Sequence, residues 1–218
     1  IASVRAEAPD VQIEGSVSRA NSEITLMNSK GGSFSYQRSG FAIGFEGTLI
    51  RGEDMLFVSD GENSVSPIDD GSGVVRSILR QLAWARTSAA VETRQMPVVF
   101  MPTAVPSVVV GPLMSALNGK AVYQGTSPLA DKLDQAVVSN RFSLLDDGTL
   151  PNVPGSRMSD DEGVPSRRLQ LIDEGVVSNF LYDLQTAGLA GAESTGSGER
   201  SLGSLPAPGS SVLVVGEG

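Results

Sequence analysis

The densest cluster of charge in the sequence is the run Ser159-Asp160-Asp161-Glu162-Gly163. Adjacent carboxylates repel one another and attract a positive group, so this acidic run could hold a cation or contact an amine of a substrate. The same run could instead be a solvated turn before Pro165, with its charge partly balanced by nearby arginines. The ligand spacing of an EF-hand loop is missing, which disfavours calcium. The residues alone leave both interpretations open.

A second segment, Ser194-Thr195-Gly196-Ser197-Gly198-Glu199-Arg200, combines glycines with hydroxyl groups and one arginine. The backbone N–H groups of such a loop can hold an anion. However, the segment lacks the lysine of a P-loop and no helical pattern follows it, so a nucleotide site is not expected. The composition favours a flexible linker or a loop that contacts a peptide.

Two further features have structural interpretations. Asp146-Asp147-Gly148 is typical of a turn that leaves a strand, in which aspartate side chains accept hydrogen bonds from nearby backbone N–H groups. The single tryptophan, Trp84, lies in a predicted helix, and we expect it to pack in the core.

The composition excludes whole classes of chemistry. The 218 residues include no histidine and no cysteine, which excludes a disulfide, a thiolate nucleophile, a Ser-His-Asp triad and a His-ligated zinc within this sequence. A metal held by this chain alone would need oxygen ligands. The net charge of −9 disfavours binding to a nucleic-acid backbone, which depends on lysine and arginine.

The elements that must position these residues follow from hydrophobic periodicity. Residues 1–68 alternate apolar and polar side chains between glycine-rich turns and predict an antiparallel β meander. Residues 69–140 predict a helical segment with one short strand, and residues 141–218 predict a β-rich segment with the glycine-rich loop. The fold class is therefore α+β, with antiparallel, meander- or barrel-like sheets and two or three helices inserted in the middle of the chain.

Individual elements can be placed more closely. The predicted helices cover residues 74–91, with Ser72 as N-cap, residues 102–117, ended by a left-handed Asn118-Gly119 pair, and residues 129–138. The predicted strands after residue 68 are a short buried one at 96–101 and others at 142–145, 168–173, 176–182 and 212–215. Asp173-Glu174-Gly175 is predicted to be a hairpin turn.

The second half of the chain resembles the TldD/PmbA family, often labelled modulators of DNA gyrase. The stretch DDEGVPSRR at residues 160–168 is similar to a family segment, and LDDGTLP at residues 145–151 resembles another. Further similar blocks occur in the family order at residues 119–127, 129–133, 155–157, 174–177, 181–183, 186–187 and 194–196. The resemblance extends to residues 28–31 and 97–100, and so covers most of the chain.

The resemblance implies a metallopeptidase system that acts on small or unfolded peptides. In that family, TldD-type subunits carry His-Glu-x-x-x-His on a helix, whereas PmbA-type (TldE) subunits lack these ligands and complete the enclosure around the peptide. Aligned on residues 116–119, the family positions for the two histidines and the glutamate fall at Val110, Ser115 and Gly111. Zinc catalysis needs imidazole ligands and a carboxylate base, so the resemblance implies a PmbA-type subunit with no cofactor or metal.

The same resemblance suggests which residues contact a peptide and which subunit this chain binds. The candidates lie in the acidic run and the glycine-rich loop: Asp160, Asp161, Glu162, Gly163, Thr195 and Gly196. We expect a heterodimer with a TldD-type subunit, or a homodimer, in the cytoplasm, without direct contact to nucleic acid or membrane. A self-sufficient hydrolase with a carboxylate-bound metal, and a peptide-binding module without enzymatic role, remain alternatives. The chain is expected to be one compact domain or a fragment of a larger family protein.

Overall fold

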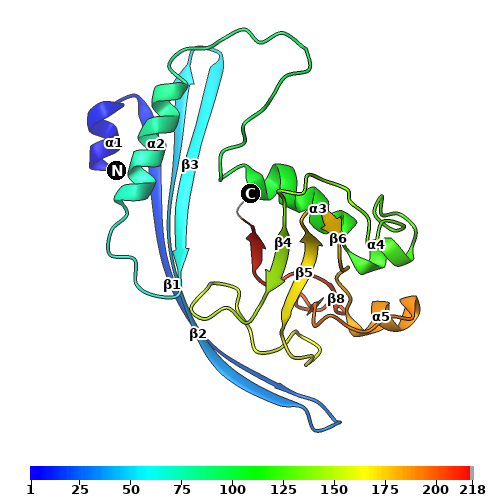
Figure 1. Ribbon diagram of the computed structural model, residues 1–218. Helices are drawn as coiled ribbons and strands as arrows, with labels where there is room; N and C mark the ends of the chain where they lie inside the picture. Colours follow the sequence, from blue (N-terminus) through cyan, green and yellow to red (C-terminus); the bar gives the residue numbers. More distant parts are fainter. Residues whose placement is uncertain (217–218) are drawn as a thin grey trace. The chain divides into compact units, whose positions relative to one another are not determined.

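The computed structural model describes residues 1–216 of the chain (Figure 1). These residues form two compact units, each with its own apolar core. Unit 1 comprises residues 1–23 and 37–96, and unit 2 comprises residues 24–36 and 97–218. The predicted α+β class with antiparallel sheets is confirmed. None of the helices in the described residues is long and apolar enough to cross a membrane.

Unit 1 is built on a three-stranded sheet in the order β1-β2-β3, as the alternating pattern predicts. The strands are β1 (Val11–Met27), β2 (Ser33–Arg51) and β3 (Asp54–Ser64), of which the residues 24–36 around the β1–β2 turn belong to unit 2. Helices α1 (Ala2–Glu7) and α2 (Ser72–Trp84) complete the unit. Val74, Ile78 and Leu82 are buried because their four-residue spacing places them on one face of α2.

Helix α2 differs from its prediction at both ends. Ser72 is the first helical residue and not the N-cap; Asp70 accepts hydrogen bonds from the Ser72 N–H and hydroxyl, both at 2.8 Å. The helix ends at Trp84, because the residues after it offer no apolar face to the core. The predicted core role of Trp84 is wrong: its side chain is 59% exposed, and the Arg80 guanidinium lies 5.4 Å from its ring centre.

The predicted buried strand at residues 96–101 is also wrong. These residues are extended but have no strand assignment, and they are exposed, Val99 to 88%. A strand requires a neighbour for its backbone N–H and C=O groups, and no strand within residues 1–216 pairs with this segment. An apolar run alone does not reveal whether such a neighbour exists.

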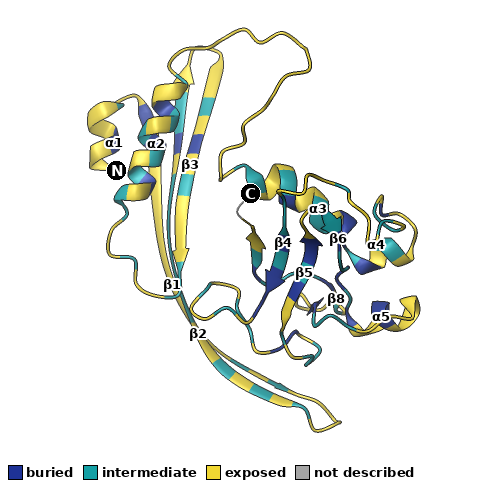
Figure 2. Ribbon diagram, viewed as in Figure 1, coloured by how far each residue is buried: buried dark blue, intermediate teal, exposed yellow. Residues whose placement is uncertain are grey.

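Unit 2 contains a four-stranded antiparallel sheet in the order β6-β5-β4-β9. The strands are β4 (Leu144–Asp147), β5 (Arg168–Asp173), β6 (Val176–Val177) and β9 (Leu213–Val215). Strand β5 matches its predicted bounds, and the Asp173-Glu174-Gly175 turn is confirmed by positive φ angles of 43° at Glu174 and 84° at Gly175. Apolar residues of β4 and β5 form the buried centre of the unit (Figure 2).

The helices of unit 2 are short. A π-helical turn, Pro106–Val110, continues into α3 (Gly111–Ala116), close to the predicted helix. The predicted left-handed pair does not end it: Asn118 is extended and caps the next helix, α4 (Gly119–Tyr123), by accepting a hydrogen bond from the Lys120 N–H at 3.0 Å. The sequence pattern did not predict α5 (Leu184–Ala190) or the short pair β7 (Gly198–Glu199) and β8 (Ala207–Pro208).

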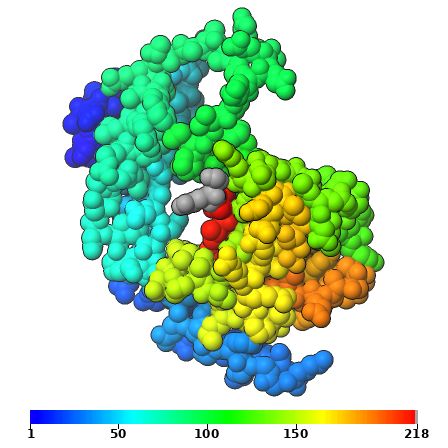
Figure 3. Space-filling view, viewed as in Figure 1, coloured from blue at the N-terminus to red at the C-terminus, as the bar shows by residue number. Residues whose placement is uncertain are grey.

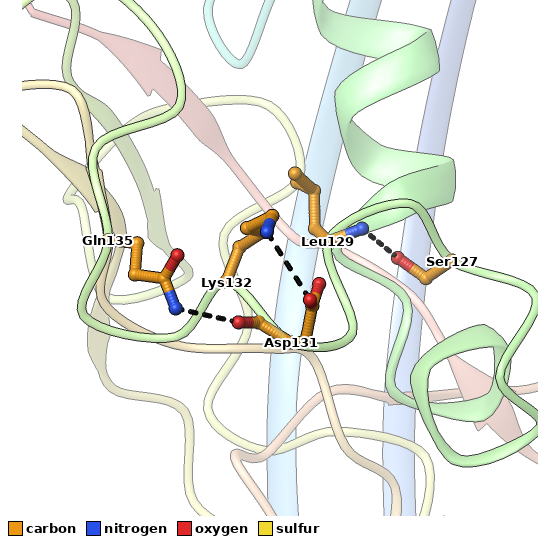
Figure 4. Close-up of polar contacts among 5 residues, drawn as sticks. All are labelled: Ser127, Leu129, Asp131, Lys132 and Gln135. Carbon is orange, nitrogen blue, oxygen red and sulfur yellow. Dashed lines mark hydrogen bonds and ion pairs between the residues drawn. The ribbon is translucent and has the colours of Figure 1, made fainter.

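The predicted helix at residues 129–138 is replaced by turns (Figure 4). The Ser127 hydroxyl donates to the Ala116 carbonyl at 2.5 Å and accepts from the Leu129 N–H at 3.0 Å. The Gln135 amide donates to the Asp131 carbonyl at 2.8 Å, and the Asp134 N–H donates to the Val177 carbonyl. Because these bonds tie the backbone to neighbouring elements, they outcompete the helical i→i−4 pattern.

Candidate functional site

The acidic run forms a tight turn organised by Asp160. Its side chain is 1% exposed, and its carboxylate accepts hydrogen bonds from the backbone N–H groups of Glu162, Val164 and Gly198 at 3.0, 2.8 and 2.8 Å. A carboxylate with three such bonds has little capacity left for a substrate amine. The structure therefore assigns Asp160 the role of fixing the turn. The predicted turn before Pro165 is present, but Asp160 is buried and not solvated, and backbone N–H groups instead of arginines contact its carboxylate.

The next two acidic residues face different surroundings. Asp161 is exposed and accepts from the Arg200 N–H at 2.7 Å. Glu162 is half-buried and accepts from the Leu184 N–H, at the start of α5, at 2.7 Å. Burial raises the pKa of Glu162, the hydrogen bond from Leu184 lowers it, and the nearby Asp183 and Asp160 carboxylates raise it further. Glu162 thus favours its protonated form more than an exposed glutamate does.

The glycine-rich loop is held firmly, so the flexible-linker interpretation does not apply. The Thr195 hydroxyl accepts from the Tyr182 N–H at 2.8 Å, and the Thr195 N–H donates to the Tyr182 carbonyl at 3.0 Å. Arg167 donates to the carbonyls of Ser194 and Thr195. Gly196 has φ +73°, and a Cβ there would lie 2.9 Å from the Pro165 carbonyl oxygen, so only glycine fits this approach. The N–H groups of Gly198 and Arg200 in this loop donate to the Asp160 and Asp161 carboxylates, so the anions that these two groups hold are side chains of the acidic run.

The structure brings the two predicted peptide-contact segments together. The Asp161 N–H donates to the Gly198 carbonyl at 3.0 Å, and the Asp160 carboxylate accepts from the Gly198 N–H. Residues 24–36 also contact the acidic turn: the Cβ position of Gly163 lies 3.0 Å from a methyl group of Leu26 and 3.8 Å from the Phe34 ring. In the space-filling view the blue atoms of this hairpin tip adjoin the yellow atoms of the acidic segment (Figure 3). The contact of these residues with a peptide stays a prediction.

The helix positions that the predicted register aligns with zinc ligands, Val110, Gly111 and Ser115, do not fit a metal. Val110 is an alkyl side chain, 8% exposed, at the end of the π-helical turn, and Gly111 has no side chain. Ser115 donates its hydroxyl hydrogen to the Gly111 carbonyl at 3.2 Å. These three positions provide neither an imidazole nor a carboxylate, so this helix cannot hold zinc as His-Glu-x-x-x-His does.

Two aspartates predicted to cap turns have structural roles. Asp147 accepts from the Thr149 N–H at 2.9 Å and the Thr149 hydroxyl at 2.6 Å, as predicted. Asp146 instead reaches across the sheet and accepts from the Ser211 and Val212 N–H groups, both at 2.9 Å. Nearby, the Arg157 Nε and Nη2 atoms are buried without a hydrogen-bond partner among the described residues.

Sequence reasoning missed a pocket beside these segments. A cavity of about 190 Å³ lies against α4, α5 and residues 206–208. Helix α5 begins at the N-cap Asp183, whose carboxylate accepts from the Thr186 N–H at 2.7 Å, and ends at Gly191 with φ 66°. An aspartate followed by a short segment and a glycine is a helix signal that the sequence contained.

Comparisons with known proteins agree on one family. The sequence model described as "PmbA/TldA metallopeptidase C-terminal domain" matches residues 93–218. The chain is 38% identical over 93 residues to a metalloprotease TldD homolog of Buchnera aphidicola, a match that covers 42% of this chain and 19% of that protein.

Two solved structures share the fold. TldE from Thermococcus kodakarensis matches with a TM-score of 0.86 and 26% identity over 100% of this chain and 50% of its own. A candidate modulator of DNA gyrase from Bacteroides thetaiotaomicron matches with a TM-score of 0.84 and 24% identity, over 100% of this chain and 48% of its own. The chain thus spans about half the length of these structures. From the match over residues 93–218, the chain belongs to the PmbA/TldD metallopeptidase family.

Proposed function

We propose that this chain acts as a TldE-like, non-catalytic part of a TldD/PmbA peptidase assembly and helps to enclose small or unfolded peptides. The observation that carries the proposal is the helix through Val110, Gly111 and Ser115. A subunit that cleaves peptides with zinc needs imidazole and carboxylate side chains at these positions, and this helix presents alkyl, hydrogen and hydroxyl groups instead.

The geometry of the acidic turn and the glycine-rich loop supports a passive role in peptide binding. Asp160 is engaged by backbone N–H groups, and the Thr195 hydroxyl by the Tyr182 backbone and the Ser197 hydroxyl, so they stiffen the surface and do not activate a water. Asp161 is exposed and Glu162 is half-buried, each carboxylate accepts one backbone N–H, and the two residues give this surface a negative charge. A rigid wall of this kind costs little entropy when a flexible peptide binds against it.

Sequence identity alone does not choose between the two subunit types. The chain is 38% identical to a TldD homolog over 93 residues, whereas the TldE structure matches the whole chain at 26% identity. The choice therefore depends on the helix and not on overall similarity. The proposed partner is a TldD-type subunit in a cytoplasmic heterodimer, with a homodimer as the other arrangement. Any effect on gyrase would be indirect, through the peptides processed.

The test combines metal analysis with reconstitution. The purified chain is expected to contain no stoichiometric zinc by mass spectrometry, and to form a complex with an HExxxH-bearing homologue from the same source. The pair should cleave an unfolded fluorogenic peptide faster than either protein alone. Stoichiometric tightly bound zinc in this chain would contradict the proposal. So would a pair that cleaves no faster than the HExxxH protein by itself.

A further inference from the structure

The pocket against α4 and α5 is the right size for one side chain. Its volume is about 190 Å³, below the roughly 300–1,000 Å³ of pockets that enclose whole small-molecule ligands. Tyr123 comes from α4, Leu189 comes from α5, and Pro206 and Pro208 come from the segment that contains β8. Polar residues supply the other half of the lining: Lys120, Gln124, Asp183, Gln185 and Thr186. The cavity therefore suits one residue that combines an apolar side chain with a polar group, at the end of a longer molecule, and not a complete cofactor.

Hydrogen bonds fix the walls of the pocket before any ligand arrives. The Asn118 amide donates to the Pro208 carbonyl at 3.0 Å, and its oxygen caps α4. The Gly119 N–H donates to the Leu181 carbonyl at 2.8 Å. The Asp183 carboxylate caps α5. Because both helix starts and the β8 segment are tied to one another, the pocket is preformed, which lowers the entropic cost of binding.

The pocket offers an apolar wall and one accessible positive charge. The side chains of Tyr123 and Leu189 are 50% and 57% exposed. Lys120 is exposed, and no carboxylate of residues 1–216 lies within ion-pair distance of its ammonium group. Asp183 is the one acidic residue among the ten that line the pocket; it is 1% exposed and one of its oxygens is bound to Thr186. Lys120 is therefore the exposed charged residue of the lining.

The pocket is connected directly to the predicted peptide-contact surface. Glu162 of the acidic turn accepts from the N–H of Leu184, the first residue of α5, and Gln185, Thr186 and Leu189 of the same helix line the pocket. For a peptide on the acidic turn to reach this pocket, it has to extend along α5 from Glu162 to Leu189. This step rests on the proposed peptide-handling function.

We infer that the pocket binds the C-terminal residue of a peptide, with its apolar side chain against Tyr123 and Leu189 and its carboxylate paired with the Lys120 ammonium group. An internal apolar residue has no carboxylate, and an internal aspartate or glutamate has little apolar surface. A chain terminus combines both on one residue. The negative charge of the acidic turn would repel a peptide with acidic side chains. The carboxylate that pairs with Lys120 is therefore the C-terminal one.

The test compares peptides that differ at one terminal group. Fluorescence anisotropy is measured with a labelled neutral hexapeptide ending in phenylalanine, either as the free acid or as the amide, and with a third version ending in glycine. The free acid should bind at least about tenfold more tightly than the amide and than the glycine peptide, a difference of about 1.4 kcal/mol. A hydrogen bond to a charged group and the burial of a phenyl ring each contribute at least that much.

Two variants assign the effect to the pocket. Lys120→Gln should abolish the preference for acid over amide while leaving amide binding unchanged, because only the charge is removed. Lys132→Gln is the matched control, since Lys132 pairs with Asp131 outside the pocket and its loss should change neither affinity. Both variants should keep the wild-type circular dichroism and melting temperature.

Three results would each overturn the inference. The wild type could bind acid and amide equally, it could bind neither up to millimolar concentration, or Lys120→Gln could keep the preference for the acid. The outcomes are separable from those of the proposed function. If the subunit pair cleaves faster than the HExxxH protein alone but Lys120→Gln binds as wild type does, the pocket assignment fails and the function stands. If the preference for the free acid depends on Lys120 but the pair cleaves no faster than the HExxxH protein alone, the pocket assignment stands and the proposed function fails.

Discussion

Replacing Asp160 by alanine should be among the most destabilising changes in unit 2. The substitution removes the acceptor of three backbone N–H groups, one of which, at Gly198, is buried. A buried donor left without a partner costs about 1–3 kcal/mol, and the two half-buried donors at Glu162 and Val164 can regain part of this from water. We therefore expect Asp160→Ala to lower the free energy of unfolding of unit 2 by about 3–5 kcal/mol.

Asp161→Ala is the matched control. Asp161 is exposed and accepts a single bond, from the exposed Arg200 N–H, which water can replace. Its loss should cost only about 0.5–1.5 kcal/mol. Asp160→Asn should fall between the two, because the amide keeps one oxygen acceptor but places an N–H₂ group against a backbone donor.

The aromatic residues provide separate signals for the two units. Trp84 lies in unit 1, whereas Tyr36, Tyr123 and Tyr182 all lie in unit 2. Urea unfolding followed by near-ultraviolet tyrosine dichroism should therefore shift to lower urea in Asp160→Ala, while the tryptophan fluorescence transition reports on unit 1. Amide hydrogen exchange at residues 162, 164 and 198 should quicken in the variant. A tyrosine transition shifted no further than in Asp161→Ala would refute the assigned role of the carboxylate.

Three other predictions follow from individual contacts. Burial and neighbouring carboxylates raise the pKa of Glu162 in the folded state, so its contribution to stability is fully present below the unfolded value near 4.5 and is lost as the pH rises through the folded pKa. Urea unfolding between pH 4 and 7 should therefore show a decline that Glu162→Gln lacks, and parallel curves for the two proteins would contradict this. Arg157→Met removes buried guanidinium nitrogens that have no partner among the described residues, so it should raise the free energy of unfolding by about 1–3 kcal/mol and raise the melting temperature with it. Arg141→Met, at an exposed position, should change the free energy of unfolding by less than about 0.5 kcal/mol. A melting temperature lowered by Arg157→Met would show that the group is satisfied in solution. Gly175→Ala should destabilise unit 2 by more than about 1 kcal/mol in thermal unfolding, because the position has φ +84° and the added Cβ would lie 2.5 Å from the Val138 carbonyl oxygen; an unchanged melting temperature would mean that the turn can relax.

Local patterns predicted the parts of the fold that local physics controls. Strand β5 and the turn at Glu174-Gly175 were predictable because apolar alternation and a left-handed glycine are both encoded within a few residues. Residues 96–101 and 129–138 have equally clear apolar patterns and were predicted wrongly. In the first case the missing information was the absence of a partner strand. In the second it was the presence of distant acceptors such as the Val177 carbonyl.

The candidate site shows the same division. The sequence suggested that the acidic run and the glycine-rich loop work together, and the structure places them in contact through Gly198. It could not tell that Asp160 accepts three backbone hydrogen bonds while Asp161 and Glu162 accept one each, because the donors to Asp160 lie up to 38 residues away. The pocket depends on Lys120 and Leu189 meeting across two helices, and no pattern along the chain encodes that meeting.

The hairpin tip at residues 24–36 makes unit 2 a discontinuous domain. Leu26 and Phe34 pack near Gly163, although more than 120 residues of chain separate them in sequence. During synthesis the tip is made early, and its docking surface is not complete until the acidic turn has emerged. A fragment of residues 97–218 expressed alone would therefore lack the hairpin tip that packs near Gly163. A synthetic peptide of residues 24–36 added to this fragment should bind to it and restore the contact.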